Sequence, residues 1–198
     1  FDNPAACFIF NDELFVTETG NDRVQVFDLN GSFRRKWGSN GSENGQFNNP
    51  RGIFVHQTDT GSPEVYIADA NNYRIQVFDL NGTFLRKFGS QGTSLGQLYV
   101  PIGVVVDSDG MVYASSSNGN EIQVFDQNGT AVREIPLGMK GEAVALSGDR
   151  LVVTGGGSHR VKILDTNGTV LNIMGSGSSG SGTGNFDDPL GVAFAPDG

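Results

Sequence analysis

The chain has 198 residues, of which 37% are hydrophobic, and it contains no apolar run near the ~20 residues that a membrane-spanning helix needs. Its net charge of −9 opposes nucleic-acid binding, because an acidic surface repels phosphate and gives up the counterion-release contribution to affinity. A single cysteine, Cys7, excludes an internal disulfide framework. We expect that thiol to be buried among apolar side chains.

Four similar phrases divide the chain, beginning at Arg23, Arg74, Glu121 and Arg160. Successive phrases are roughly 40 to 50 residues apart, which suits one small antiparallel sheet per repeat and is too long for leucine-rich or tetratricopeptide units. The repeats therefore predict a β-propeller or an arc of one.

Each repeat predicts four strands, which in the second repeat are residues 52–55, 65–68, 75–78 and 84–88. The first is expected to be innermost, since its counterparts at 103–106 and 191–194 are also small and apolar. An Asn-Gly pair separates the third and fourth strands and predicts a type I′ hairpin. Simple meander connections complete each sheet.

The motif F-x-x-P-x-G-[IV] followed by Y-[IV]-A-D-x-x-N-x-R-[IV]-Q-V-F-D-x-x-G-x-F, almost complete in residues 47–89, resembles the NHL repeat. The resemblance implies an all-β chain in which residues 1–198 form a single NHL-type propeller domain of four-stranded antiparallel blades. Its repeats lie at about 1–46, 47–97, 98–136 and 137–185, with a partial repeat at 186–198 that holds the first strand of a fifth. NHL propellers commonly have about six blades, so four repeats imply an open arc or part of a larger ring.

An arc would leave the apolar faces of its first and last blades in water, together with unpaired strand edges. The sequence leaves three solutions open: the chain is a piece of a longer one, another subunit completes the ring, or the blades close as a smaller propeller. Donation of the strand at 191–194 to a neighbouring copy would build rings or filaments.

Every hairpin Asn-Gly is followed by Ser or Thr, and a further Asn-Gly-Ser lies in a connector. These formal N-glycosylation acceptors are Asn30, Asn40, Asn81, Asn128 and Asn167. Glycosylation would make the protein extracellular or place it on the cell surface. The alternative is that Asn-Gly forms the turn, that Ser or Thr begins the next strand, and that no glycan is attached. A cytosolic location then stays open.

An acidic residue after the second strand is followed five positions later by arginine, and such a pair would fix the intervening loop by charge-assisted hydrogen bonds. Across the four repeats these positions are Glu18 and Arg23, Asp69 and Arg74, Ser116 and Glu121, and Gly155 and Arg160. The third repeat loses both partners together, as a paired role predicts, whereas the fourth keeps only its arginine.

No catalytic or metal-binding set emerges from the residue types. His56 and His159 occupy non-equivalent positions in their repeats, whereas a zinc site needs three or four converging ligands. The segment at 107–110, Asp-Ser-Asp-Gly, resembles the start of a calcium loop but lacks the closing Glu, so we predict an ordinary turn. We expect neither a cofactor nor an enzyme; a metal-dependent lyase-like propeller is the alternative.

These features predict a non-enzymatic interaction or structural module whose loops at one end bind a protein or a carbohydrate. The candidate residues on that rim are Asn21, Asp22, Asn72, Tyr73, Asn120, Ser158 and His159. Tyr73 is their single aromatic and the expected anchor. Basic runs at 34–36 and 86–87 are interpreted as guards of the outermost strand edges. The alternative function is a subunit that assembles with copies of itself into an extracellular ring or filament.

Overall fold

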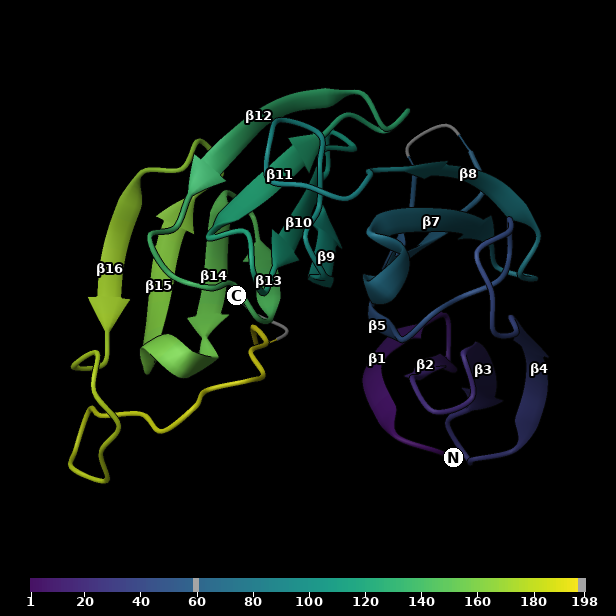
Figure 1. The fold of residues 1–198 in the computed structure, drawn as a ribbon. Helices are drawn as coiled ribbons and strands as arrows, with labels where there is room; N and C mark the ends of the chain where they lie inside the picture. Colours follow the sequence, from purple (N-terminus) through teal and green to yellow (C-terminus); the bar gives the residue numbers. More distant parts are fainter. Residues whose placement is uncertain (59–60, 196–198) are drawn as a thin grey trace.

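The computed structural model describes residues 1–58 and 61–195. Its strands form four separate antiparallel sheets of four strands each, which follow one another in an arc (Figure 1). The predicted all-β propeller architecture is therefore confirmed. Residues 196–198, the end of the predicted fifth repeat, lie outside the described residues.

Each sheet is one blade and takes its strands in chain order. Blade 1 consists of β1 (Pro4–Phe10), β2 (Glu13–Glu18), β3 (Arg23–Asp28) and β4 (Phe33–Trp37). Blade 2 consists of β5 (Pro50–His56), β6 (Glu64–Asp69), β7 (Arg74–Asp79) and β8 (Phe84–Phe88), with the short 3₁₀ turn η1 (Ala70–Asn72) after β6. Blade 3 consists of β9 (Pro101–Val106), β10 (Val112–Ser116), β11 (Glu121–Phe125) and β12 (Ala131–Pro136). Blade 4 consists of β13 (Val144–Ser147), β14 (Arg150–Gly155), β15 (Arg160–Asp165) and β16 (Val170–Met174), with η2 (Gly156–Ser158) after β14.

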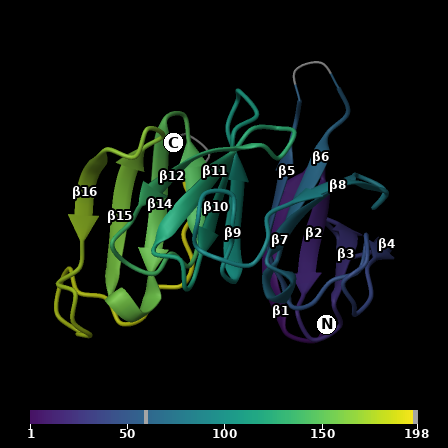
Figure 2. The ribbon, with the colours of Figure 1, turned by 45° about the horizontal axis from the view of Figure 1, so that its top comes forward.

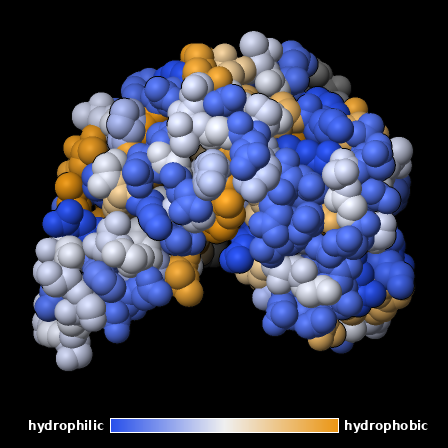
Figure 3. Space-filling model, viewed as in Figure 1, coloured by the Kyte–Doolittle hydropathy of each residue, from blue (hydrophilic) through white to orange (hydrophobic). Residues whose placement is uncertain are grey.

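The first strand of every blade lies innermost, as predicted. Figure 2 shows β5 and β9 near the middle of the molecule, with the outermost strands β4 and β16 at its two sides. A Cβ atom on Gly52 would lie 3.0 Å from the Cα atom of Gly103, so the glycine allows β5 to approach β9 closely. The inner strands surround an axial cavity of about 880 Å³, and the molecule is hollowed between its first and last blades (Figure 3).

The predicted type I′ hairpin is wrong. Such a turn needs positive φ at both central residues, but only the glycine of each Asn-Gly pair has it, as at Gly31 with φ 84°. The Gly31 N–H donates to the Asp28 carbonyl at 2.9 Å, which makes a type I turn that ends in a glycine bulge. Asp28 determines this choice, because its carboxylate accepts the N–H groups of Asn30 and Ser32.

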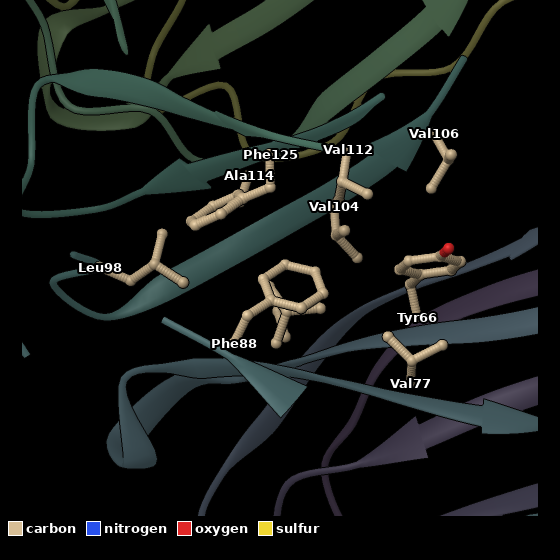
Figure 4. Close-up of a cluster of buried hydrophobic side chains, with 11 residues drawn as sticks. Tyr66, Val77, Phe88, Leu98, Val104, Val106, Val112, Ala114 and Phe125 are labelled. Atoms are coloured by element: carbon tan, nitrogen blue, oxygen red, sulfur yellow. The ribbon is translucent and has the colours of Figure 1, made fainter. Parts of the chain in front are cut away.

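The hydrophobic core lies between consecutive blades, in one cluster at each of the three blade junctions. Figure 4 shows the junction of blades 2 and 3, where Tyr66, Val77 and Phe88 meet Val104 and Phe125. Blade 1 packs against blade 2 through alternate residues of β1, including Phe8. Cys7 therefore points to the opposite face and is exposed, so the expected burial of that thiol is wrong.

Arginines of the outermost strands tie each blade to the next. Arg35 donates from Nε to the Leu80 carbonyl at 2.7 Å and holds Glu13 with both terminal nitrogens. Arg86 repeats the arrangement with the Gln127 carbonyl and Glu64. The basic residues at these positions thus join blades rather than form a free basic stripe.

A hydroxyl on the second strand also reaches the inner strand of the next repeat. Thr17 donates to the Arg51 carbonyl at 2.6 Å, and Ser115 donates to the Glu142 carbonyl at 2.7 Å. Thr154 makes the same contact with the Leu190 carbonyl at 3.2 Å. The fifth repeat therefore begins where a next inner strand would lie, although residues 191–195 have no sheet partner. Among the described residues, no helix has the length and apolar character needed to cross a bilayer.

Candidate functional site

The two ends of the blades carry different loops, because neighbouring strands run in opposite directions. We call the end that carries residues 19–22, 70–73, 117–120 and 156–159 the loop rim, and the end that carries the Asn-Gly turns the hairpin rim. All seven predicted binding residues lie on the loop rim. Four of the five glycosylation acceptors lie on the hairpin rim, and the connector residue Asn40 is the exception.

The residue before the third strand has a left-handed backbone in every blade. The φ values of Asp22, Tyr73, Asn120 and His159 are 47°, 57°, 61° and 52°. Non-glycine residues rarely adopt this conformation, which costs about 1–3 kcal/mol at a single position. The repetition indicates that the fold requires a tight reversal here and that these side chains are presented in a fixed direction.

Several predicted binding residues are already engaged within the protein. Asn21 and Asn72 donate their side-chain amides to the carboxylates of Glu18 and Asp69, at 3.1 and 2.9 Å. Asp22 accepts the N–H of Asn49 at 2.7 Å. These three side chains hold the loop rim in shape, and whether they also bind a partner stays a prediction.

The fourth blade presents its rim residues differently. His159 accepts the N–H of Asp188 through Nδ1 at 3.2 Å, so its ring holds the start of the fifth repeat. Ser158 is half-buried at the end of η2, and Asn120 in the preceding blade is exposed. Of the predicted rim residues, Tyr73, Asn120 and Ser158 are thus the ones with no side-chain hydrogen bond in the described structure.

An aromatic pair joins the rims of blades 2 and 3. The rings of Tyr73 and Tyr99 lie 5.9 Å apart between centroids with an interplanar angle of 48°. Tyr99 keeps 37% of its surface exposed and precedes Val100, which has a positive φ of 61° before Pro101. Sequence reasoning missed Tyr99, because it follows a connector and its partner belongs to the preceding blade.

The structure brings both predicted ion pairs together. Arg23 Nε lies 2.5 Å from Glu18, and Arg74 Nε lies 2.8 Å from Asp69. Both carboxylates are fully buried. Burial alone would raise the pKa of Glu18, but hydrogen bonds from Arg23 and its other donors lower that pKa to about 2. The pairs fix the loop rim from beneath.

The hairpin rim is held by acidic turn residues. The carboxylates of Asp28, Asp126 and Asp165 each accept two backbone N–H groups, and these bonds lower the pKa of all three groups. Asp107 caps its turn in the same way, so the Asp-Ser-Asp-Gly segment is the ordinary turn that we expected. All five glycosylation acceptors have exposed side chains.

The axial cavity is lined mainly by small apolar residues. Its charged lining residues are Arg51 and Glu142, and its lining residues with a thiol or hydroxyl are Cys7 and Ser147. His56 lies at the end of β5 and His159 on the loop rim, so the two imidazoles do not converge. Within residues 1–58 and 61–195, no group of three or more His, Cys, Asp or Glu side chains is placed to hold a metal ion.

No protein-family model matches the chain. Among curated proteins, the chain is 34% identical over 101 residues to Protein brain tumor of Drosophila melanogaster, a match that covers 50% of this chain and 9% of that protein. It is 38% identical over 65 residues to RING finger protein nhl-1 of Caenorhabditis elegans, which covers 33% of this chain and 6% of that protein. The matched segments thus span less than a tenth of these curated relatives.

Similar solved structures share the fold at low sequence identity. Virginiamycin B lyase from Staphylococcus aureus superimposes with a TM-score of 0.66 at 15% identity, covering 98% of this chain and 61% of that one. A chain of the Nidogen/Laminin complex has a TM-score of 0.66 at 20% identity, covering 82% and 59%. At such identities the likeness concerns the fold alone.

Proposed function

The chain carries NHL-type repeats folded as the blades of a β-propeller, and on this premise we propose that it is a non-enzymatic scaffold that binds a protein partner through its loop rim. The observation that carries the proposal is the contact between the half-buried Tyr73 and the exposed Tyr99, two large aromatics on the rims of neighbouring blades. Aromatic anchors of this kind dominate the free energy of many protein interfaces. The Nidogen/Laminin complex supports the proposal, because a similar propeller takes part there in an assembly of two proteins.

Replacement of Tyr73 by alanine is expected to weaken partner binding by roughly thirtyfold, which corresponds to about 2 kcal/mol for loss of one anchor. A photo-reactive phenylalanine at position 73 would first identify the partner by cross-linking and mass spectrometry, and surface plasmon resonance would then compare the variants. Leu85→Ala, which removes an exposed side chain from the outermost strand β8, is the control. Equal affinities for the two variants would refute the proposal. An aromatic pair can also stack on a sugar, so retention of a glycan instead of a protein would identify a carbohydrate partner.

We extend the proposal to location: the protein is extracellular or on the cell surface and carries N-linked glycans. The support is that all five acceptor asparagines are exposed, four of them at turn tips. Intact mass spectrometry of protein from its natural source, before and after glycosidase treatment, should show a loss of mass. An unchanged mass would favour the alternative in which Asn-Gly-Ser/Thr serves the turn alone.

Self-assembly is the second candidate function, and it is favoured by the free face of blade 1. Phe1, Ile9 and Phe33 are 70%, 60% and 53% exposed there. Their counterparts on blade 2 are covered by blade 1, so this is a surface shaped to meet another blade. Light scattering should then give particles above 21.0 kDa that shrink in Ile9→Glu but not in Leu85→Glu. A 21.0 kDa particle at every concentration would exclude assembly through this face.

The lyase-like alternative has less support. Among the described residues, the cavity-lining side chains that carry charge or a nucleophile are Cys7 on β1, Arg51 on β5, Glu142 before β13 and Ser147 at its end, so they are spread over three repeats. Degradation of virginiamycin B by the purified protein would contradict the non-enzymatic proposal.

A further inference from the structure

Two buried oxygen atoms of blade 3 have no hydrogen-bond partner among the described residues, and they lie on the residues where β10 ends and β11 begins. Figure 1 shows the position of these two strands. Ser116 is fully buried, and its Oγ atom has no hydrogen-bond partner. The Oε1 atom of Glu121 is also buried and unpartnered. Buried oxygen atoms of this kind are costly unless a donor or a cation satisfies them.

Both oxygens belong to one small site. A Cβ atom on Gly119 would clash with Glu121 Oε1 and would lie 3.1 Å from Ser116 Cβ. The glycine thus leaves room for the Glu121 carboxylate beside Ser116. This site is distinct from the aromatic pair on the same rim and does not depend on the proposed function.

A guanidinium fills the corresponding place in blade 2. Arg74 donates from Nε to Asp69 at 2.8 Å. Its terminal nitrogens donate to three carbonyls of the connector between blades 1 and 2, those of Ser42, Glu43 and Gln46, at 2.7, 2.9 and 3.0 Å. The connector carbonyls therefore face a positive charge in that blade.

The connector between blades 2 and 3 folds in the same way but meets no such arginine. Three hydrogen bonds recur at equivalent positions of the two connectors. The Gly41 N–H donates to the Phe47 carbonyl as the Gly92 N–H does to the Leu98 carbonyl, and the Gln46 N–H donates to the Glu43 carbonyl as the Gln97 N–H does to the Ser94 carbonyl. The Gly45 N–H donates to the side-chain oxygen of Gln76, as the Gly96 N–H does to that of Gln123. The carbonyls of Thr93, Ser94 and Gln97 consequently take the places of those that Arg74 binds. In blade 3 they face a carboxylate, which can only accept hydrogen bonds when it is ionised.

The surrounding charges have also reversed sign. Blade 2 has Asp69 and Arg74 in the site and Lys87 opposite Gln76 on the next strand, whereas the equivalent positions of blade 3 are Ser116, Glu121 and Glu134. Burial raises the pKa of Glu121, a side-chain hydrogen bond with Gln123 opposes that shift, and the nearby Glu134 carboxylate adds to it. Among the described residues, neither Glu121 nor Glu134 forms an ion pair, so this arrangement of acids and backbone carbonyls suits a cation.

We propose that a calcium ion binds here, held by the Glu121 carboxylate, the Ser116 hydroxyl and the connector carbonyls, in the place that a guanidinium occupies in blade 2. Calcium accepts six to eight oxygen ligands in flexible geometry, including carboxylates and backbone carbonyls. Magnesium demands near-ideal octahedral geometry and keeps more of its water, so it suits such a site less well. Glu134 lies beside the site as a second negative charge.

Calcium titration of the chelator-treated protein tests the proposal. We expect one ion per chain by isothermal titration calorimetry and, at about a hundredfold excess over Kd, a rise in Tm of roughly 5–10 °C at constant ionic strength. Glu121→Gln, of nearly equal size, should abolish the response. Asp109→Asn, which removes the exposed second acid of the calcium-loop lookalike on the hairpin rim, should leave the response intact.

A rebuilt ion pair provides an independent test. The double variant Ser116→Asp/Glu121→Arg restores the residues of blade 2, so its metal-free Tm should rise and its calcium response should vanish. The proposal is wrong if the wild-type protein binds no calcium, if Glu121→Gln responds like the wild type, or if Asp109→Asn loses the response. It is equally wrong if acidification, rather than calcium, stabilises the protein, because Glu121 would then be satisfied as a neutral donor. If Glu121→Gln does not fold, the calorimetric stoichiometry and the double variant decide.

Discussion

Replacement of Asp69 by alanine should destabilise the protein by about 3–5 kcal/mol, because it leaves the buried Arg74 guanidinium without its counter-charge. Asp69 is fully buried and also accepts the backbone N–H of Asn48 at 2.8 Å and the side-chain amide of Gln76 at 3.0 Å. One substitution therefore leaves hydrogen-bond donors of the connector, the loop rim and β7 without their acceptor. Guanidinium-induced unfolding, followed by tryptophan fluorescence and circular dichroism, measures the effect.

The control removes a carboxylate from an exposed turn. Asp109→Ala is expected to change the unfolding free energy by less than about 0.5 kcal/mol. A double-mutant cycle with Arg74→Ala should show that the two changes together cost less than the sum of the single ones, since the double variant leaves no unpaired charge. A cost below about 1 kcal/mol for Asp69→Ala would mean that the pair is dispensable.

Replacement of Phe125 by alanine should cost about 3–5 kcal/mol by opening a cavity at the junction of blades 2 and 3. Phe125 is 1% exposed, and its ring centroid lies 4.9 Å from that of Phe88 across the junction (Figure 4). The loss should also reduce cooperativity, because each blade is stabilised mainly by its neighbours. Differential scanning calorimetry would detect this as a lower Tm and a broader transition.

Phe33→Ala is the matched control for that experiment, since it deletes the same side chain where it is 53% exposed. We expect it to change stability by less than about 1 kcal/mol in the monomer. If Phe125→Ala and Phe33→Ala cost equally little, the junction cluster would not be what holds the blades together.

Most of the fold could be predicted from the sequence, because the same pattern of four strands recurs in each repeat. Alternation in 75–78 and its counterparts identified the third strands, and small apolar residues identified the innermost ones. The hairpin type was not predicted correctly. The carboxylate of Asp28 competes for the turn N–H groups and selects a different turn from the one that Asn-Gly alone favours.

The candidate site was less predictable, because it depends on contacts between blades. Tyr73 was expected from its repeat position, but its partner Tyr99 lies beyond a connector whose path no local pattern reveals. Asn72 was predicted to bind a partner, and the sequence did not reveal that its amide donates to Asp69. The oxygen-lined site of blade 3 was missed because half of its expected ligands are backbone carbonyls, which residue types do not disclose.

Cys7 gives the molecule a natural reporter. It is the one thiol in the chain, it is exposed, and it lies beside the axial cavity on the face of blade 1 that any further blade would cover. The rate at which a small alkylating reagent modifies this thiol therefore measures how fully that face is covered, without any engineered residue. The same position can carry a fluorophore, so ring closure, copy-to-copy contact and ligand entry into the cavity all become observable through a single native atom.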